Sequence, residues 1–453
     1  MIMFENKKIL VLGMARSGYE VCKYLSKYNN TIILNDGGSR DKQDENKVLE
    51  LEKLGVTLIF DSHPDDLLDD SFDYVIKNPG IRNDHKYVIK AKELGIEVIN
   101  EAEMAYRLLP DDVTLIGITG TNGKTTTTTL TYEMIKKSGK KVHLAGNIGY
   151  PLCSFLEKLE SGDIIVMEVS CQQLANMDKF NPHIALMTNL SEAHIDFFGN
   201  YDEYKKVKLK LFANQTEDDV SILNIENDEV MKGTVDIKSN VKYFSSKREV
   251  NGAYFIDNKL YYYDEFIMNR DEFLLKGNHN VENALGAMMV AKEVGVDNES
   301  IVSVLKTFTG VRHRLEFIDK VNGVDYYNDT EATNTKCTTI ALSSFDKNVI
   351  LILGGLERGQ EFHDLDNFIS PVKEIVGIGE CRDRVKEYGD SVGIKTNVFQ
   401  KLSEAMNYIN SVVMDGDTVL LSPASASWDQ YKQCEDRGDE FRDIVRSFKD
   451  SEK

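Results

Sequence analysis

Long apolar runs, prolines and paired cysteines are all scarce in this 453-residue sequence. A membrane-spanning helix needs roughly 18 consecutive apolar residues, whereas the basic pair Lys7-Lys8 is followed only by Ile9 to Leu12 before Gly13. That short run indicates a first buried strand and not a signal peptide. The six cysteines show no Cys-x-x-Cys spacing, which argues against a zinc ribbon or a redox pair. We therefore expect a cytoplasmic protein without a membrane span.

Positive charge is also in short supply, because 54 Lys and Arg face 74 Asp and Glu, which gives 54 − 74 = −20 at neutral pH. A net charge of this sign repels nucleic acid and anionic membranes at long range. We expect no nucleic-acid partner, and any phosphorylated ligand must be held by local donors. Only 7 prolines and a 42% share of apolar residues fit a globular protein and argue against a disordered or fibrous one.

Apolar runs of strand length alternate with amphipathic stretches of helix length almost throughout the chain. This alternation is typical of α/β folds in which helices cover both faces of parallel sheets. A polar break at Leu109-Pro110 and a glycine at Gly310 divide the chain into three predicted domains, 1–109, 110–309 and 310–453. This number agrees with the roughly two to four domains expected from the length.

A glycine-rich segment lies between the predicted strand Leu115–Thr119 and a helix that begins at Lys124. Such a loop lets backbone N–H groups surround phosphate oxygens, while Lys124 neutralises charge and the Thr125 hydroxyl can bind Mg²⁺. The strict pattern places glycine five residues before Gly123, where this chain has Ile118. The alternative is a glycine-rich turn that binds nothing.

Glu168 ends the apolar run Ile164 to Met167. A sheet that carries a phosphate loop holds a metal-binding acid at such a position. Taken alone, a strand that ends in glutamate needs no functional explanation.

Lys208 falls within the apolar stripe of a predicted helix that follows His194. Residues of this helix, Tyr201 to Phe212, are apolar at the helical spacing of Tyr204, Val207, Leu211 and Phe212. An inward-facing lysine must extend to solvent, pair or lose its charge. The simplest interpretation is a stem whose amine reaches water.

The segment Gly13 to Gly18 follows the first strand as a dinucleotide-binding turn does, and Asp36 ends the second strand. Because Ala15 replaces the middle glycine, the turn suits a nucleotide diphosphate better than NAD. Asn280 and Asn283 begin a later helix and by themselves indicate helix capping.

Together these motifs resemble the Mur ligase family of peptidoglycan synthesis over essentially the whole chain. The segments that carry the resemblance are Gly120–Thr126, Gly146–Gly149, Glu168–Ser170, Thr188–Leu190, His194–Asp196, Tyr204–Lys208, Gly277–Asn280 with Asn283, His313-Arg314, Asn328-Asp329 and Ser422–Asp429. The resemblance implies a Rossmann-like N-terminal domain for a UDP-sugar, a central P-loop ATPase-like domain and a Rossmann-like C-terminal domain for an amino acid. It further implies an ATP-dependent ligase that acts through an acyl phosphate, as a monomer, on UDP-N-acetylmuramoyl-L-alanine and D-glutamate.

The resemblance also assigns site residues. Expected ATP-binding residues are Gly120, Thr121, Asn122, Gly123, Lys124, Thr125, Thr126, Asn280, Asn283, Arg314 and Asp329. Expected substrate residues are Gly13, Arg16, Ser17, Gly18 and Asp36 for uridine diphosphate, Asn147, Ser170 and Gln173 for the muramoyl-alanyl arm, and Thr333, Arg358 and Ser427 for D-glutamate. Two Mg²⁺ ions are implied, one on Thr125 and Glu168, the other on His194 and a carbamylated Lys208. Lys124, His194 and Lys208 are the implied catalytic residues.

Two positions depart from the family pattern, and other functions stay open. Glu331 stands where the family commonly has lysine, and Arg358 replaces another lysine while keeping a carboxylate-binding charge. The alternatives are ligases that add alanine or a diamino acid, folylpolyglutamate synthase, an NAD-dependent oxidoreductase and a nucleotide switch. The oxidoreductase would leave the phosphate loop without a role, and the switch would not explain three sheets.

Overall fold

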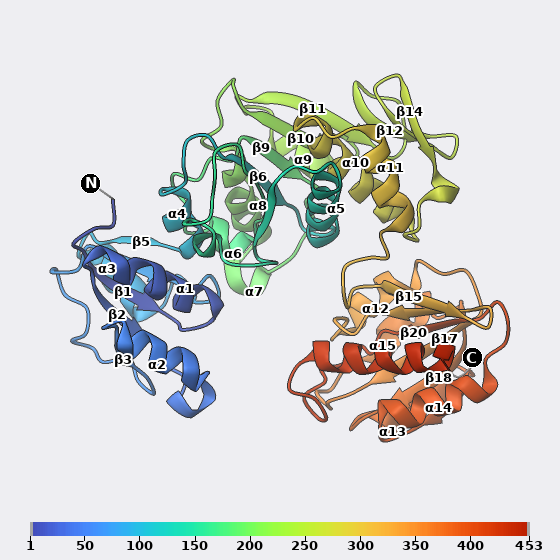
Figure 1. Ribbon diagram of the computed structural model, residues 1–453. Helices are drawn as coiled ribbons and strands as arrows, with labels where there is room; N and C mark the ends of the chain where they lie inside the picture. The colour runs from blue at the N-terminus through green and yellow to red at the C-terminus, as the bar shows by residue number, and fades with distance from the viewer. Residues whose placement is uncertain (1–2, 451–453) are drawn as a thin grey trace. The chain divides into compact units, whose positions relative to one another are not determined.

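A computed structural model describes residues 3–450 of the chain (Figure 1). Its residues form two compact units, Met1–Arg270 with Glu282–Val304, and Asp271–Val281 with Leu305–Lys453. Three sheets are present, two in the first unit and one in the second. The predicted α/β fold class is confirmed. The domain boundaries at 109/110 and 309/310 stay a prediction.

The first sheet is fully parallel, with the strand order β3-β2-β1-β4-β5. Its strands are β1 (Lys8–Leu12), β2 (Thr31–Asn35), β3 (Thr57–Ile59), β4 (Tyr74–Lys77) and β5 (Glu97–Ile99). The helices around it are α1 (Arg16–Leu25), α2 (Glu45–Lys53), α3 (Lys86–Glu93) and α4 (Glu101–Tyr106), with short 3-10 turns η1 (Ser26–Tyr28) and η2 (Arg40–Lys42). Helix α1 passes directly into the 3-10 turn η1.

The second sheet has the order β14-β13-β12-β11-β10-β9-β6-β8-β7. Its parallel strands are β6 (Thr114–Thr119), β7 (Val142–Gly146), β8 (Ile164–Glu168), β9 (Ile184–Met187), β10 (Val220–Asn224), β11 (Asn240–Ser245) and β12 (Gly252–Ile256). The antiparallel strands β13 (Lys259–Tyr262) and β14 (Glu265–Asn269) complete it. The antiparallel pairs β12–β13 and β13–β14 thus extend the parallel part of this sheet.

Helices of this region begin after the strands, as in a parallel sheet wound with helices. They are α5 (Lys124–Lys137), α6 (Cys171–Leu174), α7 (Ile195–Phe198), α8 (Tyr201–Leu209), α9 (Asp228–Gly233), α10 (Asn278–Glu293) and α11 (Asn298–Thr307), with 3-10 turns η3 (Leu152–Ser154), η4 (Lys210–Phe212) and η5 (Arg270–Glu272). Asn200 caps α8 by accepting a hydrogen bond from the Glu203 amide. The predicted helix 201–212 therefore ends in the 3-10 turn η4.

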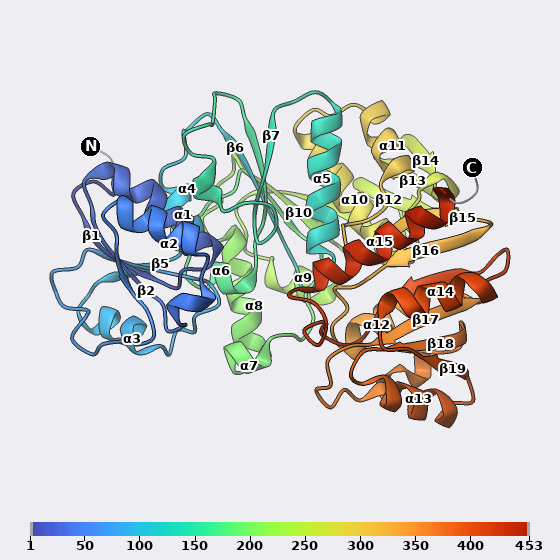
Figure 2. The ribbon, with the colours of Figure 1, turned by 60° about the horizontal axis from the view of Figure 1, so that its bottom comes forward.

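The third sheet has the order β15-β16-β20-β17-β18-β19, in which only the β15–β16 pair is antiparallel. Its strands are β15 (Glu316–Val321), β16 (Val324–Asn328), β17 (Val349–Gly354), β18 (Val372–Ile378), β19 (Lys395–Val398) and β20 (Thr418–Leu421). Its helices are α12 (Thr335–Leu342), α13 (Arg382–Ser391), α14 (Leu402–Val412) and α15 (Cys434–Asp450), with the 3-10 turn η6 (Phe362–Phe368). Figure 2 shows α15 beside β15 and β16.

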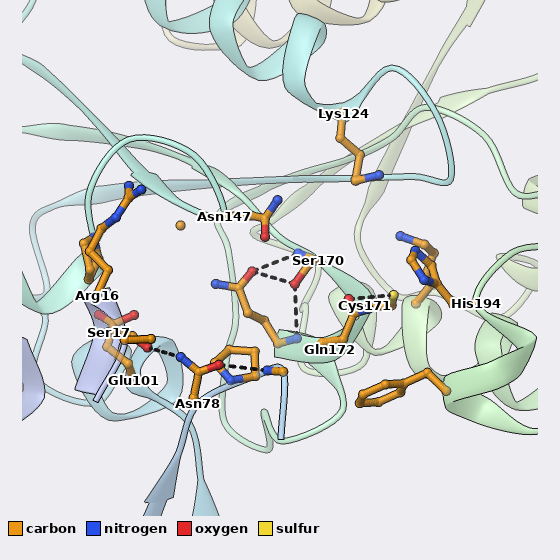
Figure 3. Close-up of a pocket in the computed structure, with 18 of the residues that line it drawn as sticks. Arg16, Ser17, Asn78, Glu101, Lys124, Asn147, Ser170, Cys171, Gln172 and His194 are labelled. Atoms are coloured by element: carbon orange, nitrogen blue, oxygen red, sulfur yellow. Dashed lines mark hydrogen bonds between the residues drawn. The ribbon is translucent and has the colours of Figure 1, made fainter. Parts of the chain in front are cut away.

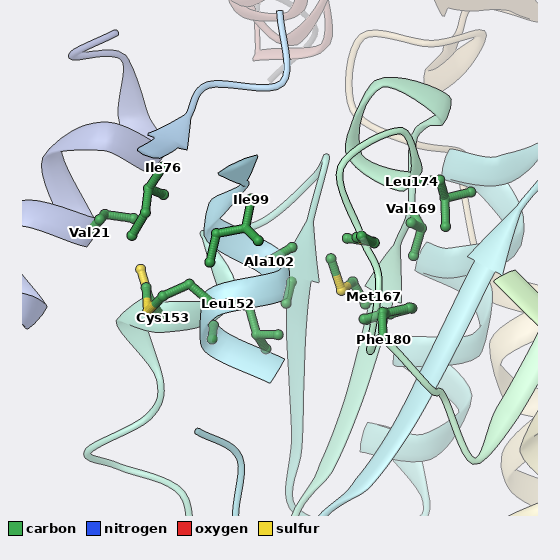
Figure 4. Packing of buried hydrophobic residues seen from close by; sticks show 14 of the residues in the cluster. Val21, Ile76, Ile99, Ala102, Leu152, Cys153, Met167, Val169, Leu174 and Phe180 are labelled. Carbon is green, nitrogen blue, oxygen red and sulfur yellow. The ribbon is translucent and has the colours of Figure 1, made fainter. Parts of the chain in front are cut away.

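One hydrophobic core of the first unit links its two sheets, while a second core, which contains Leu10, Val75 and Val88, lies within the first sheet's region. The linking core joins Val21 of α1 and Ile76 of β4 to Met167 of β8 and to Phe180, which precedes β9, through Ala102 of α4 (Figure 4). In the second unit, alternate residues of β17 enter two cores, so both faces of the third sheet are covered. Among the described residues, no helix combines the length and the apolar composition that crossing a membrane requires.

Candidate functional site

The predicted phosphate loop joins β6 to α5, and two of its glycines have conformations or surroundings that exclude a side chain. Gly123 has φ of 78°, and a Cβ there would lie 2.2 Å from Asn283 Oδ1. A Cβ on Gly120 would lie 1.9 Å from Thr188 Oγ1. Glycine is therefore required at both positions. Thr121, Asn122, Lys124, Thr125 and Thr126 complete the loop and the first turn of α5.

Hydrogen bonds to the residues that directly follow β9 hold this loop in its conformation. The Thr121 amide donates to the carbonyl of Asn189 over 2.9 Å, and the Asn122 amide donates to Asn189 Oδ1 over 2.9 Å. Thr188 Oγ1 donates to the carbonyl of Asn122 over 2.6 Å. The ammonium group of Lys124 donates to the Thr121 carbonyl over 2.9 Å, so it lies over its own loop. This is the geometry of a preformed anion-binding loop.

Glu168 lies beside the loop because β6 and β8 are adjacent parallel strands, with Ile118 paired to Glu168. Its side chain is buried, and its Oε1 accepts a hydrogen bond from Asn147 Nδ2 over 2.7 Å. Its Oε2 is buried without a hydrogen-bond partner among the described atoms. A buried carboxylate oxygen in this state is a suitable ligand for a hard cation.

Lys208 is buried, with only 1% of its surface exposed. Its Nζ donates to Thr119 Oγ1 over 3.0 Å, at the end of β6. Burial, and next the charge of Lys124, lower the pKa of this amine to about 7. The interpretation of Lys208 as a stem with its amine in water is therefore wrong, because the amine ends inside the protein and not at its surface.

A cavity of about 630 Å³ brings the two halves of the first unit together (Figure 3). Figure 3 shows Arg16 and Ser17 on one side and Lys124 and His194 on the other. The complete set of predicted residues in its lining is Arg16, Ser17, Lys124, Asn147, Ser170, Gln173, His194 and Lys208. The sequence thus predicted residues from both sheets that the fold gathers around one space.

Several hydrogen bonds fix the lining of this cavity. Ser170 and Gln173 form a reciprocal capping box at the start of α6. Arg16 Nη1 donates to the carbonyl of Gly149 over 2.9 Å. His194 has the left-handed backbone angle φ of 53° just before α7, and its ring centroid lies 6.1 Å from that of Tyr204. Contacts within the protein therefore hold several of the lining residues in place.

Sequence reasoning missed other residues that line this cavity. They are Ala15, Asn78, Pro79, Gly80, Glu101, Gly146, Pro151, Cys171, Gln172, Phe197 and Tyr204. The Asn78-Pro79-Gly80 turn directly after β4 was a usable signal, because parallel strands direct their carboxyl ends to one edge. Glu101 gave no such signal. Its Oε1 accepts a hydrogen bond from the Cys153 amide over 2.7 Å, and burial raises its pKa to about 7.

The turn after β1 also has the predicted tight form. Gly13 has φ of 87°, and a Cβ on Gly18 would lie 1.9 Å from the Gly13 carbonyl oxygen. Asp36 accepts hydrogen bonds from the amides of Met14 and Gly38, each over 2.7 Å. Gly13, Asp36 and their neighbours line a second cavity of about 280 Å³.

The two predicted adenine contacts fall in different compact units. Asn283, in the first unit, accepts a hydrogen bond from Thr127 Oγ1 of α5 over 3.3 Å. Asn280, in the second unit, donates to the Lys276 carbonyl over 2.7 Å. Asn283 therefore lies directly beside the phosphate loop.

In the second unit, the predicted residues Asp329, Thr333, Arg358 and Ser427 follow the neighbouring parallel strands β16, β17 and β20. Asp329 follows β16, and its carboxylate accepts from Ser422 Oγ over 2.7 Å and from the Leu315 amide over 3.0 Å. Burial raises its pKa to about 7. Arg314 forms an ion pair with Glu331, with 2.6 Å between Nη2 and Oε2. The family departure at Glu331 thus sits against a predicted ATP contact.

The three residues expected to bind the amino acid follow the ends of β16, β17 and β20. Thr333 precedes α12, and Arg358 lies 5.4 Å from the ring of Trp428 in a cation–π arrangement. Ser427 is buried, and its Oγ has no hydrogen-bond partner among the described atoms. Arg437 was missed by the sequence: its buried guanidinium donates to the carbonyls of Thr330 and Ser425.

Within residues 3–450, no three His, Cys, Asp or Glu side chains come together as a ready-made metal site. A cation at the loop would therefore depend on Glu168 together with hydroxyl, phosphate or modified lysine ligands.

Comparison with known proteins gives a consistent result. The family model described as "Mur ligase middle domain" matches residues 118–291. A UDP-N-acetylmuramoylalanine--D-glutamate ligase of Lactococcus lactis subsp. cremoris (strain MG1363) is 43% identical over 98% of this chain and 99% of its own length. The enzyme of the same name from Bacillus thuringiensis (strain Al Hakam) is 41% identical over 98% of both chains.

Solved structures show the same fold at lower identity. A UDP-N-acetylmuramate-alanine ligase from Thermotoga maritima has a TM-score of 0.58 at 19% identity, covering 98% of this chain and 100% of the other. A MurF ligase from Thermotoga maritima in complex with ADP has a TM-score of 0.58 at 16% identity, covering 92% of this chain and 95% of the other.

Proposed function

The chain belongs to the Mur ligase family, and on that premise we propose that it joins D-glutamate to UDP-N-acetylmuramoyl-L-alanine in an ATP-dependent step of peptidoglycan precursor synthesis. The observation that carries the proposal is the 41–43% identity, over 98% of the chain, to ligases named for this reaction. The cavity that joins the phosphate loop to the Arg16 turn supports it. A nucleotide switch or an NAD-dependent oxidoreductase does not account for that arrangement.

We assign the three ligands to the three predicted domains. Residues 1–109 bind the UDP-sugar, 110–309 bind ATP and 310–453 bind D-glutamate. The site residues named from the sequence keep these roles as part of the proposal. The enzyme is proposed to act in the cytoplasm as a monomer, and a dimer mass in solution light scattering would contradict the latter point.

Activation of a carboxylate is the chemical problem, because its oxygen is a poor leaving group. In the proposed reaction, an oxygen of the alanyl carboxylate attacks the γ-phosphorus of ATP, and ADP leaves. The amine of D-glutamate then attacks the acyl carbon, and the C–O bond to phosphate breaks as the amide forms. Lys124 and the loop amides stabilise the charge that develops on the phosphoryl oxygens.

The residues present fit two Mg²⁺ ions. The unpartnered Oε2 of Glu168 with the Thr125 hydroxyl would hold one, and His194 with a carbamylated Lys208 would hold the other. Bound Mg²⁺ would reduce the repulsion between the carboxylate and the γ-phosphate. Glu168, buried at the end of β8, would supply a carboxylate ligand beside the phosphate loop.

The surroundings of Lys208 support its proposed carbamylation. An amine with a pKa of about 7 is partly neutral at physiological pH. The neutral nitrogen attacks the carbon of CO₂, forms an N–C bond and releases one proton. The product places an anion beside Lys124, where a protonated Lys208 would repel the Lys124 ammonium group.

A phosphate-release assay tests the proposed function. We expect release from ATP only when UDP-N-acetylmuramoyl-L-alanine and D-glutamate are both present. L-Alanine or a diamino acid in place of D-glutamate is the matched control for the neighbouring ligases. Release that needs only ATP, or equal release with the control amino acids, would contradict the assignment.

A further inference from the structure

The 280 Å³ cavity of the first unit contains two histidines to which the proposed roles give no function. It is lined by Gly13, Asn35 and Asp36 at the carboxyl ends of β1 and β2, and by His63 and His85. Both histidines are half-buried. A concave space with a few convergent polar groups is the usual form of a small-ligand site.

The carboxylate of Asp36 is already engaged by the protein. Its Oδ2 accepts from the Met14 amide and its Oδ1 accepts from the Gly38 amide, each over 2.7 Å. Asp36 therefore ties the turns after β1 and β2 together. A ligand in this cavity needs further polar groups for recognition.

His63 presents a hydrogen-bond acceptor. Asn35 Nδ2 donates to the carbonyls of Ile59 and Ser62, over 3.1 and 2.8 Å, so its Oδ1 is the atom that faces His63 Nδ1. An amide oxygen can only accept, which places the ring proton on Nδ1. In the neutral ring, Nε2 of His63 is left as an acceptor.

His85 presents the opposite group. It caps α3, and its Nδ1 accepts from the Tyr87 amide over 3.3 Å. In the neutral ring the proton is therefore on Nε2, which is a donor. Burial, and then the neighbouring His63, lower the pKa of His85 and favour this neutral form. The two rings meet edge to face, with centroids 4.8 Å apart.

The loop that carries His63 is tied to α3, so the two rings keep their positions. The hydroxyl of Tyr87 donates to the Pro64 carbonyl over 2.5 Å, and Lys86 Nζ donates to the His63 carbonyl. The buried Tyr87 ring packs against both imidazoles. One acceptor and one donor thus line the same cavity, on rings whose positions these contacts fix.

We propose that His63 and His85 are the base-reading residues of the nucleotide site and that they select uracil over cytosine. Uracil presents the N3–H donor beside a carbonyl acceptor, which complements the pair. Cytosine presents an acceptor at N3 beside an amino donor, which opposes it. The inference rests on the proposed use of a uridine nucleotide and adds which residues recognise its base.

Calorimetric titration of the full-length protein with UDP and with CDP tests the pair. We expect UDP to bind wild type at least about tenfold more tightly than CDP, because CDP leaves the half-buried imidazole nitrogens unpaired. His63→Phe and His85→Phe keep aromatic packing but lose the polar atoms. The ratio of the affinities for UDP and CDP should therefore fall toward one in these variants. His63→Gln and His85→Gln should keep part of it, and His363→Phe, on an exposed ring of the second unit, should keep all of it.

Circular dichroism would verify that each variant is folded, and the glutamine variants guard against loss of structure in the phenylalanine ones. Equal binding of UDP and CDP to wild type, no UDP binding at all, or an unchanged ratio in both phenylalanine variants would overturn the inference. A retained preference for UDP together with no ligase activity would instead contradict the proposed function and leave the base-reading pair standing.

Discussion

At the residue scale, the site concentrates positive charge in a chain whose net charge is −20. Lys208 is buried beside the phosphate loop, and the charge of Lys124 helps to lower its pKa. Two amines that repel each other inside a protein favour a site completed by an anion. The phosphates of a nucleotide, and a carbamate on Lys208, both meet this requirement.

Lys124→Ala is expected to lower kcat/KM by about 100-fold or more, because the loop loses its charge at the phosphates. The matched control is Lys137→Ala at the exposed end of the same helix, which should keep wild-type activity. Circular dichroism should be unchanged in both. Near-wild-type turnover by Lys124→Ala would show that the loop is not the ATP site.

Lys208→Ala is expected to lose activity by about 100-fold, since the charge of the proposed carbamate is lost. Acetate should restore part of it by occupying the space of the carbamate. The control is Lys206→Ala, which changes an exposed lysine of α8. This variant should keep wild-type activity, and acetate should not change that activity. Full activity in Lys208→Ala without acetate, or an intact-protein mass without the added CO₂ under native conditions, would argue against the modification.

Residue positions could be predicted where local pattern and chemistry coincide, as for Lys124 at the start of α5 and Glu168 at the end of β8. Helical spacing placed Lys208 on the inward face but could not tell that its amine ends at Thr119. Arg437 was beyond reach, because its acceptors Thr330 and Ser425 lie at the ends of separate strands. Contacts of this kind depend on the sheet order, which the sequence does not show locally.

At the element scale, the turn from β6 to α5 and the end of α5 allow a matched comparison of two glycines. Gly123 and Gly139 both have positive φ, but only at Gly123 would a Cβ meet other atoms, those of Asn283. Gly139→Ala should cost about 1–2 kcal/mol of unfolding free energy from backbone strain alone.

Gly123→Ala should cost more and should also raise the KM for ATP at least tenfold, because the loop must shift away from Asn283. Denaturant unfolding and steady-state kinetics measure the two effects. Equal KM values for ATP in Gly123→Ala and Gly139→Ala would contradict the proposed role of the loop.

The central strands of each sheet could be predicted because both of their faces are buried, which produces continuous apolar runs such as those of β1, β8 and β17. The strand β15 was missed because its edge position admits Asp319 and Lys320. The three-residue strand β5 is too short for a pattern. Sheet order was also out of reach, since β20 pairs between β16 and β17.

At the scale of the whole molecule, the first two sheets form one compact unit although the sequence predicts a boundary between them. The reason is the core that passes through α4, together with Glu101 at the start of that helix. Glu101 is buried and bonded to the Cys153 amide of the second sheet's region. No local sequence pattern distinguishes a helix that packs against both sheets from an ordinary linker between domains.

The buried Glu101 at the start of α4 predicts that stability depends on pH. The pKa of Glu101 is raised to about 7 in the folded protein from 4.5, so between these values the folded state holds a proton that the unfolded state has lost. Stability from this group therefore falls as pH rises from about 4.5 to about 7 and is constant above.

Glu101→Gln should reduce the loss of unfolding free energy between pH 5 and pH 8 by about 2 kcal/mol. Glu93→Gln, at an exposed position of α3, should leave the loss unchanged. Denaturant unfolding at the two pH values measures it. The same pH dependence in Glu101→Gln and wild type would show that Glu101 is ionised in the folded protein.

The central claim is that the enzyme joins an amino acid to a carboxylate by transferring a phosphoryl group to that carboxylate. The most direct measurement uses UDP-N-acetylmuramoyl-L-alanine with ¹⁸O in both oxygens of the alanyl carboxylate, together with ATP and D-glutamate, and mass spectrometry of both products. The proposed reaction predicts one ¹⁸O in the released phosphate and one in the new amide. Release of phosphate without ¹⁸O, or without formation of the D-glutamyl product, would contradict it.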